Sequence, residues 1–184
     1  MGLSDVPDPT PDALHISLTR ITPDRIDGQS KNSVTVSGTL TNVGKLPISD
    51  IDVRLQRGDY APYGNALRHT LTEDQINYPT TLPFHHLATT LNPGDSTSFT
   101  LTARIHGGDG DTLNINAPGV YPLLVNVNGR VSNSDSARLH DARVLLPVLS
   151  LPGSDRQDPA TVASRPTTIL WPLALTPVSY THLT

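Results

Sequence analysis

Apolar and polar residues alternate in short segments along residues 13–149, and turns rich in glycine and proline separate these segments. The clearest case is SVTVSGTLTN at 33–42, where Val34, Val36 and Leu40 share one side and hydroxyl side chains share the other. Side chains of a strand point alternately to its two faces, so this pattern predicts a strand with one buried face. Similar alternation predicts strands at 13–21, 48–57, 96–106, 118–127 and 137–149.

These segments predict an all-β fold, an immunoglobulin-like antiparallel β-sandwich of about seven strands over residues 13–149. Asn128-Gly129 is expected to form a hairpin turn, because this pair is the strongest short-range hairpin motif. Tyr121 follows a turn at the start of the expected penultimate strand, the position of the tyrosine corner in such domains. The alternative is a partly buried tyrosine with no special hydrogen bond. The connection at 58–92 is expected to be irregular, because prolines and glycines interrupt it.

The segments outside the expected sandwich differ from it in composition. Residues 1–12 are polar and contain three prolines, so we expect a disordered leader. Residues 150–166 lack periodicity and are expected to form a linker. The nearly continuous apolar run at 167–174 suits a strand buried on both faces, and we interpret it as the first strand of a truncated α/β domain.

Charge and composition narrow the function classes. The chain has 13 Lys and Arg against 17 Asp and Glu, a net charge of −4, and only Lys31 and Lys45 among lysines. This argues against nucleic-acid binding, which needs phosphate neutralisation by clustered basic residues. The absence of cysteine excludes disulfides, cysteine zinc sites and thiol nucleophiles. The sequence contains no run of 18 apolar residues, so it predicts no transmembrane helix. The first residues do not resemble a signal peptide.

No motif of catalysis or cofactor binding stands out, so the chain is expected to be no enzyme and to hold no cofactor or metal. His85 and His86 are adjacent, which places them on opposite faces of an extended segment and suits chelation poorly. Asp109, Asp111 and Asn114 could offer oxygen ligands to calcium, but their spacing does not match an EF-hand loop. A solvated turn is the simpler interpretation of that segment.

Half of the aromatic residues fall within the connection at 58–92: Tyr60, Tyr63, Tyr78 and Phe84. Aromatic rings can stack on sugar rings or anchor a protein partner. These four are therefore the candidate contact residues for a ligand or a partner. The alternative is that the connection folds over one end of the sandwich and buries them.

Several phrases of the chain resemble one family in their order and spacing. They are SVTVSGTLTNVGKLPISDIDVRLQ, LNPGDSTSFTL, PGVYPLLVNVNG and ARVLLPVLSLP, followed by ILWPLA. Over residues 13–174 the chain resembles the N-terminal part of an actinobacterial membrane-protein family, domain of unknown function 6049. The end of the chain, PVSYTHLT, departs from the family pattern and resembles translated sequencing-adapter read-through, so residues 175–184 are expected to be non-native.

The resemblance implies a much longer protein with a signal peptide, an immunoglobulin-like domain, an α/β region and a transmembrane helix near its C-terminus. Genes of the family commonly neighbour the lipid II flippase gene, which implies work in the cell envelope. The expected function is therefore a non-catalytic, extracytoplasmic structural or interaction module. Its expected partners are the missing α/β domain, cell-wall glycan or envelope proteins. The alternatives are a carbohydrate-binding module that uses the loop aromatics and an accessory domain of an envelope enzyme.

Overall fold

The computed structural model describes residues 13–60, 78–108, 110–132 and 134–154. Every regular element in these residues is a strand: β1 (Leu14–Thr22), β2 (Ser33–Asn42), β3 (Ile48–Arg57), β4 (Thr80–Thr81), β5 (His85–Leu91), β6 (Ser96–Arg104), β7 (Gly119–Val131) and β8 (Ala137–Val148). Within them, no helix is long and apolar enough to cross a membrane. The expected leader at 1–12, the expected strand at 167–174, the segment 175–184 and most of the expected linker lie outside the described residues.

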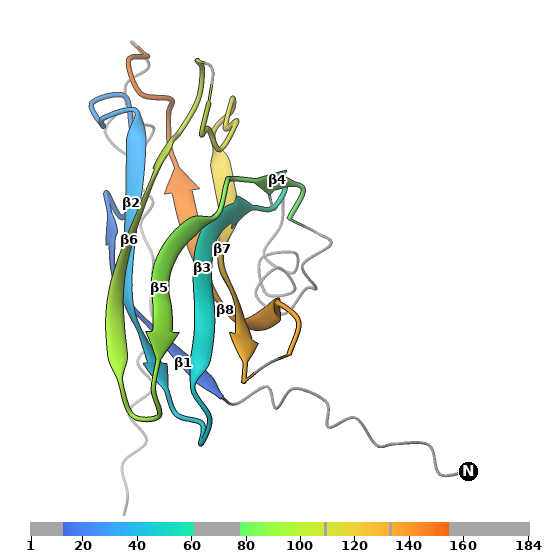
Figure 1. Cartoon of the computed structure of the whole chain (residues 1–184). Helices are drawn as coiled ribbons and strands as arrows, with labels where there is room; N and C mark the ends of the chain where they lie inside the picture. The colour runs from blue at the N-terminus through green and yellow to red at the C-terminus, as the bar shows by residue number, and fades with distance from the viewer. Residues whose placement is uncertain (1–12, 61–77, 109, 133, 155–184) are drawn as a thin grey trace, which may run out of the picture.

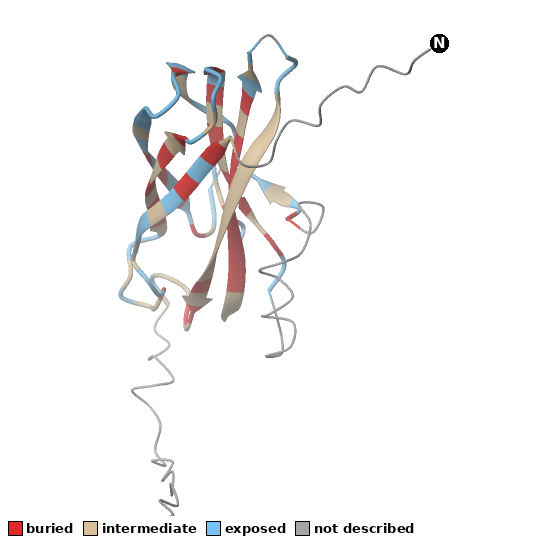
Figure 2. Cartoon of the chain, turned by 90° about the horizontal axis from the view of Figure 1, so that it is seen from below, coloured by how far each residue is buried: buried red, intermediate tan, exposed pale blue. Residues whose placement is uncertain are grey.

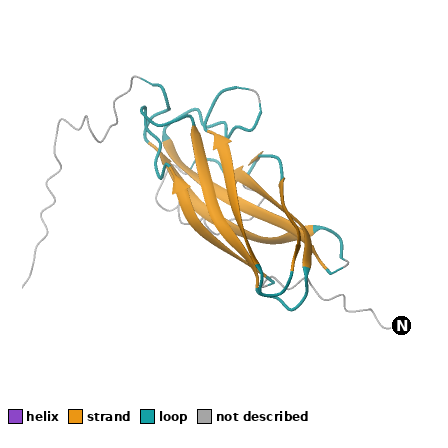
Figure 3. Cartoon of the chain, turned by 60° about the vertical axis from the view of Figure 1, so that its left-hand side comes forward, coloured by secondary structure: helices purple, strands orange, loops and turns teal. Residues whose placement is uncertain are grey.

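Two antiparallel sheets pack face to face (Figures 1 and 3). One sheet has the order β1-β2-β6, and the other has the order β4-β3-β7-β8 with β5 also paired to β3. Strands β1, β2 and β6 correspond to strands A, B and E of an immunoglobulin-like sandwich. Strands β3, β7 and β8 correspond to C, F and G. The predicted all-β, immunoglobulin-like β-sandwich is confirmed, with eight described strands where about seven were expected.

The core lies between the sheets and is built from the alternating apolar residues (Figure 2). The predicted bounds of β2 and β3 are those observed, and β1, β6 and β8 begin or end within two residues of the prediction. Val36 of one sheet is 1% exposed and Val125 of the other is 0% exposed. Burial of such aliphatic side chains supplies the main stabilisation of a sandwich, at about 25 cal/mol per Å² of apolar surface.

The predicted hairpin turn at Asn128-Gly129 is wrong, because both residues lie inside β7. They pair with Arg138 and Ala137 of β8, and the chain turns only after Val131. A Cβ atom on Gly129 would lie 2.9 Å from Cδ1 of Leu139, so this glycine allows close packing within the strand. The sequence motif could not distinguish this need for space from the need for a positive φ.

The connection at 58–92 is less irregular than expected. Strand β5 lies within it, antiparallel to β3, with His86 opposite Asp52 and Leu91 opposite Ile48. The sequence HHLATTL has no regular alternation of apolar and polar residues, so its pattern does not predict a strand. Pairing with β3 makes it a strand.

The tyrosine corner at Tyr121 is confirmed. Its hydroxyl donates a hydrogen bond of 2.9 Å to the carbonyl oxygen of Ala117, four residues upstream. Burial raises the pKa of this hydroxyl, although the nearby Arg57 opposes the shift. The contact ties the start of β7 to the connection that precedes it.

Contacts with the sandwich continue through residues 150–154, where the expected linker begins. Ser150 is 1% exposed, and Leu151 packs against the core. The amide of Gly153 donates to the carbonyl oxygen of Gly28 at 3.0 Å. The folded unit therefore includes these five residues.

Candidate functional site

Three rows of side chains cross the outward face of strands β3, β7 and β8, because directly paired residues of neighbouring strands point to the same face. The rows are Gln56–Leu124–Arg143, Arg54–Asn126–Asp141 and Asp52–Asn128–Arg138. Although this face points away from the core, Leu124 is 0% exposed and Gln56 and Asn126 are 1% exposed. A face of this composition, partly buried and rich in arginine, is the most distinctive surface of the described chain.

At the β5 side of this face lies a group of four residues, here called the Phe84 patch: the exposed Phe84 and His86 and the half-buried Asp52 and Arg54. The guanidinium carbon of Arg54 lies 4.3 Å from the centroid of the Phe84 ring, and Phe84 is 38% exposed. Burial lowers the pKa of Arg54, and repulsion from Arg138 lowers it further. Nδ1 of His86 donates to the Asp52 carboxylate at 3.1 Å. The patch thus combines an aromatic ring, a cation positioned on it and a hydrogen bond between a histidine and a carboxylate.

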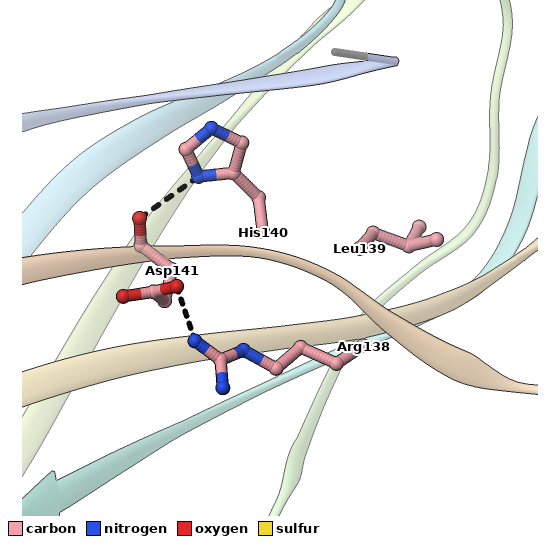
Figure 4. A pocket seen from close by; sticks show the side chains of 4 residues that line it. All are labelled: Arg138, Leu139, His140 and Asp141. Atoms are coloured by element: carbon pink, nitrogen blue, oxygen red, sulfur yellow. Dashed lines mark hydrogen bonds and ion pairs between the residues drawn. The ribbon is translucent and has the colours of Figure 1, made fainter. Parts of the chain in front are cut away.

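Farther across the same face, Asp141 is held between two arginines. Nε of Arg143 donates to Oδ2 of Asp141 at 2.8 Å, and Arg138 bonds the other carboxylate oxygen. Burial pushes the pKa of Asp141 up, but the hydrogen bonds from the two arginines outweigh it, so the pKa lies below its usual range. Arg138 and Asp141 border a cavity of about 240 Å³ together with Leu139 and His140 (Figure 4). The ring of His140 donates from Nδ1 to the Asp141 carbonyl oxygen at 2.8 Å.

The three candidate aromatic residues that the structure describes do not form one stacking surface. Tyr78 is 2% exposed, so its ring offers no face to a ligand, and Tyr63 lies outside the described residues. Tyr60 is 52% exposed and packs on Tyr121, with ring centroids 6.2 Å apart. Of the described three, Tyr60 and Phe84 remain accessible.

These two accessible rings lie at separate places on the sandwich. Tyr60 is three residues beyond the end of β3 and belongs to the end of the sandwich at Tyr121. Phe84 instead contacts Arg54 on the outward face of the sheet. Arg54 precedes Tyr60 by six residues in the chain. Tyr60, Tyr78 and Phe84 therefore present no common platform.

A second cavity, of about 320 Å³, lies between residues 79–83 and the loop at 110–114. Asp111 and Asn114, two of the calcium candidates, border it, and Asp109 lies outside the described residues. The amide of Asn114 donates to Oγ1 of Thr112 at 3.2 Å, as in a side-chain-stabilised turn. In the described part of the chain, no three histidine or acidic side chains are grouped so that they could hold a metal ion.

The outward face of the β1-β2-β6 sheet is very different, since it consists mainly of hydroxyl side chains, with His15 and Arg20 on β1 and Arg104 at the end of β6. The hydroxyl side chains are those of Ser17, Thr19, Thr35, Ser37, Thr39, Thr41, Ser96, Ser98, Thr100 and Thr102. Hydrogen bonds join hydroxyls across β2 and β6: Thr35 to Thr102 at 2.9 Å and Ser37 to Thr100 at 3.2 Å. Strand β2 carries no charged residue, and β6 carries none before Arg104.

No family model matches the chain, and no curated protein matches it. The chain is similar to the alkylpurine DNA glycosylase AlkC of Pseudomonas fluorescens, solved with DNA containing an abasic site analogue. The identity is 18% and the TM-score 0.42, over 73% of this chain and 30% of that one. It is also similar to the sporulation control protein Spo0M of Bacillus subtilis, at 13% identity and TM-score 0.41, over 74% and 49% of the two chains.

A third similar structure is the CARDB domain of the PF1109 protein from Pyrococcus furiosus, in complex with di-metal ions. The identity is 14% and the TM-score 0.40, over 74% of this chain and 85% of that one. This chain spans less than half the length of the glycosylase and of Spo0M. At these TM-scores, the three likenesses carry no argument about what this chain does.

Sequence reasoning identified Phe84 but missed the arginine beneath it and the Arg138–Asp141–Arg143 group. Arg54 and Asp52 occupy polar positions in the alternation of β3 and lie on its outward face. What the alternation could not supply was the pairing of β3 with β7, because these two strands are far apart in the chain. The register of β7 with β8 was missed for another reason, since the expected turn at Asn128-Gly129 lies inside β7.

Proposed function

We propose that the chain is a non-catalytic structural and interaction module in the extracytoplasmic part of a larger cell-envelope membrane protein, of the family described as domain of unknown function 6049. The ordered series of phrases from SVTVSGTLTNVG to ILWPLA supports the family and, through it, the location. The observation that carries the interaction role is the Phe84 patch, where an exposed ring rests on an arginine of a rigid sheet.

The geometry of the patch favours contact with a partner. Aromatic residues and arginine are enriched among the residues that contribute most to binding energy at protein interfaces. Ordering a long side chain on binding costs about 0.5–1.5 kcal/mol. Arg54 is already positioned on the Phe84 ring, so a smaller part of that cost remains for a partner to offset.

The partner that we propose is the α/β region of the same longer protein. The test is calorimetric titration of the module with that region, each made as a separate polypeptide. Phe84→Ala should weaken binding at least about tenfold, because loss of an aromatic anchor at the centre of an interface typically costs about 2 kcal/mol or more. Val43→Ala is the matched control, since Val43 is 56% exposed in the β2–β3 connection, away from the patch. Equal binding by both variants would contradict the assignment of the patch.

The second candidate is a carbohydrate-binding module, favoured by the accessible rings of Phe84 and Tyr60. An exposed ring can stack on a sugar, and the Asp52–His86 pair offers polar groups beside Phe84. Titration with soluble peptidoglycan fragments, followed by tyrosine fluorescence and by NMR shifts, separates the two functions. Saturable shifts that Phe84→Ala or Tyr60→Ala abolishes would support the glycan. If the highest fragment concentration causes no shift, the carbohydrate-binding function is excluded and the function of binding a protein partner remains. The remaining alternative is an accessory role beside an enzyme region of the longer protein. That role also requires the module to bind a neighbouring region of the same protein, so the calorimetric titration tests it too.

A further inference from the structure

The edges of the two sheets are unequally protected against pairing with another strand. Natural proteins protect edges with bulges, charged residues, prolines or very short strands. The β1 ladder is irregular between Leu18 and Arg20, and the β3–β5 ladder is irregular between Ile51 and Asp52. Strand β8 has an irregularity opposite Val127 and carries Arg138, Asp141 and Arg143.

Strand β6 has none of these devices over most of its length. Its ladder with β2 runs from Ser33–Arg104 to Thr41–Ser96 without a register shift. Among the described strands it pairs with β2 alone, so its other side is a sheet edge (Figure 1). From Ser96 to Ala103 the strand has no charged residue and no proline. It is therefore a regular, uncharged edge of the kind that accepts a further strand.

The hydrogen-bond pattern shows which backbone groups face this edge. The amide of Arg104 donates to Asp111 and its carbonyl oxygen accepts from Leu113, at 3.1 and 2.8 Å, so residue 104 points its backbone outward. Alternate residues of a strand point their backbone groups to the same side. The amides and carbonyls at 96, 98, 100 and 102 therefore face the open edge. The short hydroxyl contact between Thr35 and Thr102 agrees, because side chains come closest in the pairs without backbone hydrogen bonds.

An antiparallel copy of the same strand fits the open part of this edge. The segment 111–113 lies against the backbone of Arg104, so the open part runs from Ser96 to Thr102. In an antiparallel pair of identical strands, the outward amides and carbonyls of one copy meet the same set of groups in the other. This stretch carries no charge, so self-pairing sets no like charges opposite each other.

We propose that the open edge of β6 is a self-association surface, and that its occupant is a second copy of this chain. The two copies pair antiparallel along β6 about a two-fold axis and form a continuous sheet of six strands. Their two hydroxyl faces then join into one. This surface is distinct from the Phe84 patch on the other sheet and does not depend on the proposed function.

Sedimentation velocity over a concentration series tests the proposal. We expect the wild-type chain to dimerise with increasing concentration. Thr100→Lys places two lysines near each other across the two-fold axis and should weaken dimerisation at least about tenfold. Thr39→Lys adds the same charge to the same face on the central strand β2 and should leave dimerisation intact. Both side chains point outward, and thermal melts check that both variants fold.

Single-cysteine variants give a second measurement, because the chain has no cysteine of its own. Thr100→Cys should form a disulfide-linked dimer on mild oxidation, since paired strands bring such residues within disulfide reach. Thr39→Cys should not, because the two β2 strands would be about 14 Å apart. A wild-type chain that stays monomeric at every concentration would overturn the proposal. So would equal dimerisation of the two lysine variants, or equal cross-linking of the two cysteine variants.

Discussion

The two sheets obey the same alternation on their inward faces and differ sharply on their outward faces. The β1-β2-β6 sheet presents serine and threonine hydroxyls that bond to one another in solvent. The outward face of β3, β7 and β8 presents arginines, two aspartates and amides, several of them buried. The difference matters energetically, because a buried polar group that loses its partner costs far more than an exposed one.

This contrast separates tolerance from function. On the hydroxyl face, each side chain can exchange its neighbour for water at little cost. On the arginine face, Asp141 is held by Arg138 and Arg143 and is only 22% exposed at its side chain. A substitution there leaves a partly buried charge without its partner. We therefore expect graded effects of substitutions in the core, on the arginine face and on the hydroxyl face.

The largest effect is expected in the core that both sheets share. Val36→Asp in one sheet and Val125→Asp in the other should each unfold the module, because each buries an unpaired carboxylate. The loss should exceed roughly 4 kcal/mol, which is comparable to the total stability of many domains. Thermal melting followed by circular dichroism measures it. Thr35→Asp, the neighbour of Val36 that points outward, is the control and should melt cooperatively. Cooperative melting of Val36→Asp or Val125→Asp would refute the assigned inward faces.

The second prediction concerns the arginine face. Asp141→Asn keeps the shape of the side chain but removes the charge that Arg138 and Arg143 hold. We expect a loss of about 1–3 kcal/mol in urea unfolding, as for other hydrogen bonds to charged groups. Asp50→Asn is the matched control, because the Asp50–Arg130 pair is half exposed on both sides and should contribute little. A smaller loss for Asp141→Asn than for Asp50→Asn would contradict the contrast between the two sites.

The same residue predicts a dependence on pH. The pKa of Asp141 is lower in the folded state than in the unfolded chain, because its hydrogen bonds with the arginines outweigh the opposing effect of burial. The contribution of Asp141 to stability is therefore complete above its pKa in the unfolded chain, which is about 4. This contribution is lost as the pH falls through the lower pKa of Asp141 in the folded state. Unfolding curves between neutral and acid pH should show a smaller acid loss in Asp141→Asn than in the wild type.

The sequence allowed the strands and the core to be predicted where the local pattern decides the structure. Val34, Val36 and Leu40 were placed inward because period-two alternation depends only on neighbours in the chain. Tyr121 was placed at a corner because it follows a turn. The outcome differed at Gly129, whose role depends on Leu139 of the paired strand and on Ile48 of another.

The candidate site was harder to predict because its residues come together through pairing. Phe84 was singled out for being aromatic, but its contact with Arg54 depends on β5 lying beside β3. Tyr78 was an equally good candidate contact residue from the sequence, but its side chain is buried. Composition identifies residues that can make contacts, and only the sheet order decides which of them face solvent.

The smallest effect is expected on the hydroxyl face. Thr35→Val and Thr102→Val remove the two ends of a hydrogen bond of 2.9 Å and keep the branched shape that favours a strand. Each should change the free energy of unfolding by less than about 0.5 kcal/mol, as exposed substitutions do. A double-mutant cycle in urea measures the coupling between the hydroxyls, which should also stay below about 0.5 kcal/mol. A coupling as large as the loss in Asp141→Asn would mean that the hydroxyl face is as strongly specified as the arginine face. The distinction between the two sheets would then lie in their charge alone.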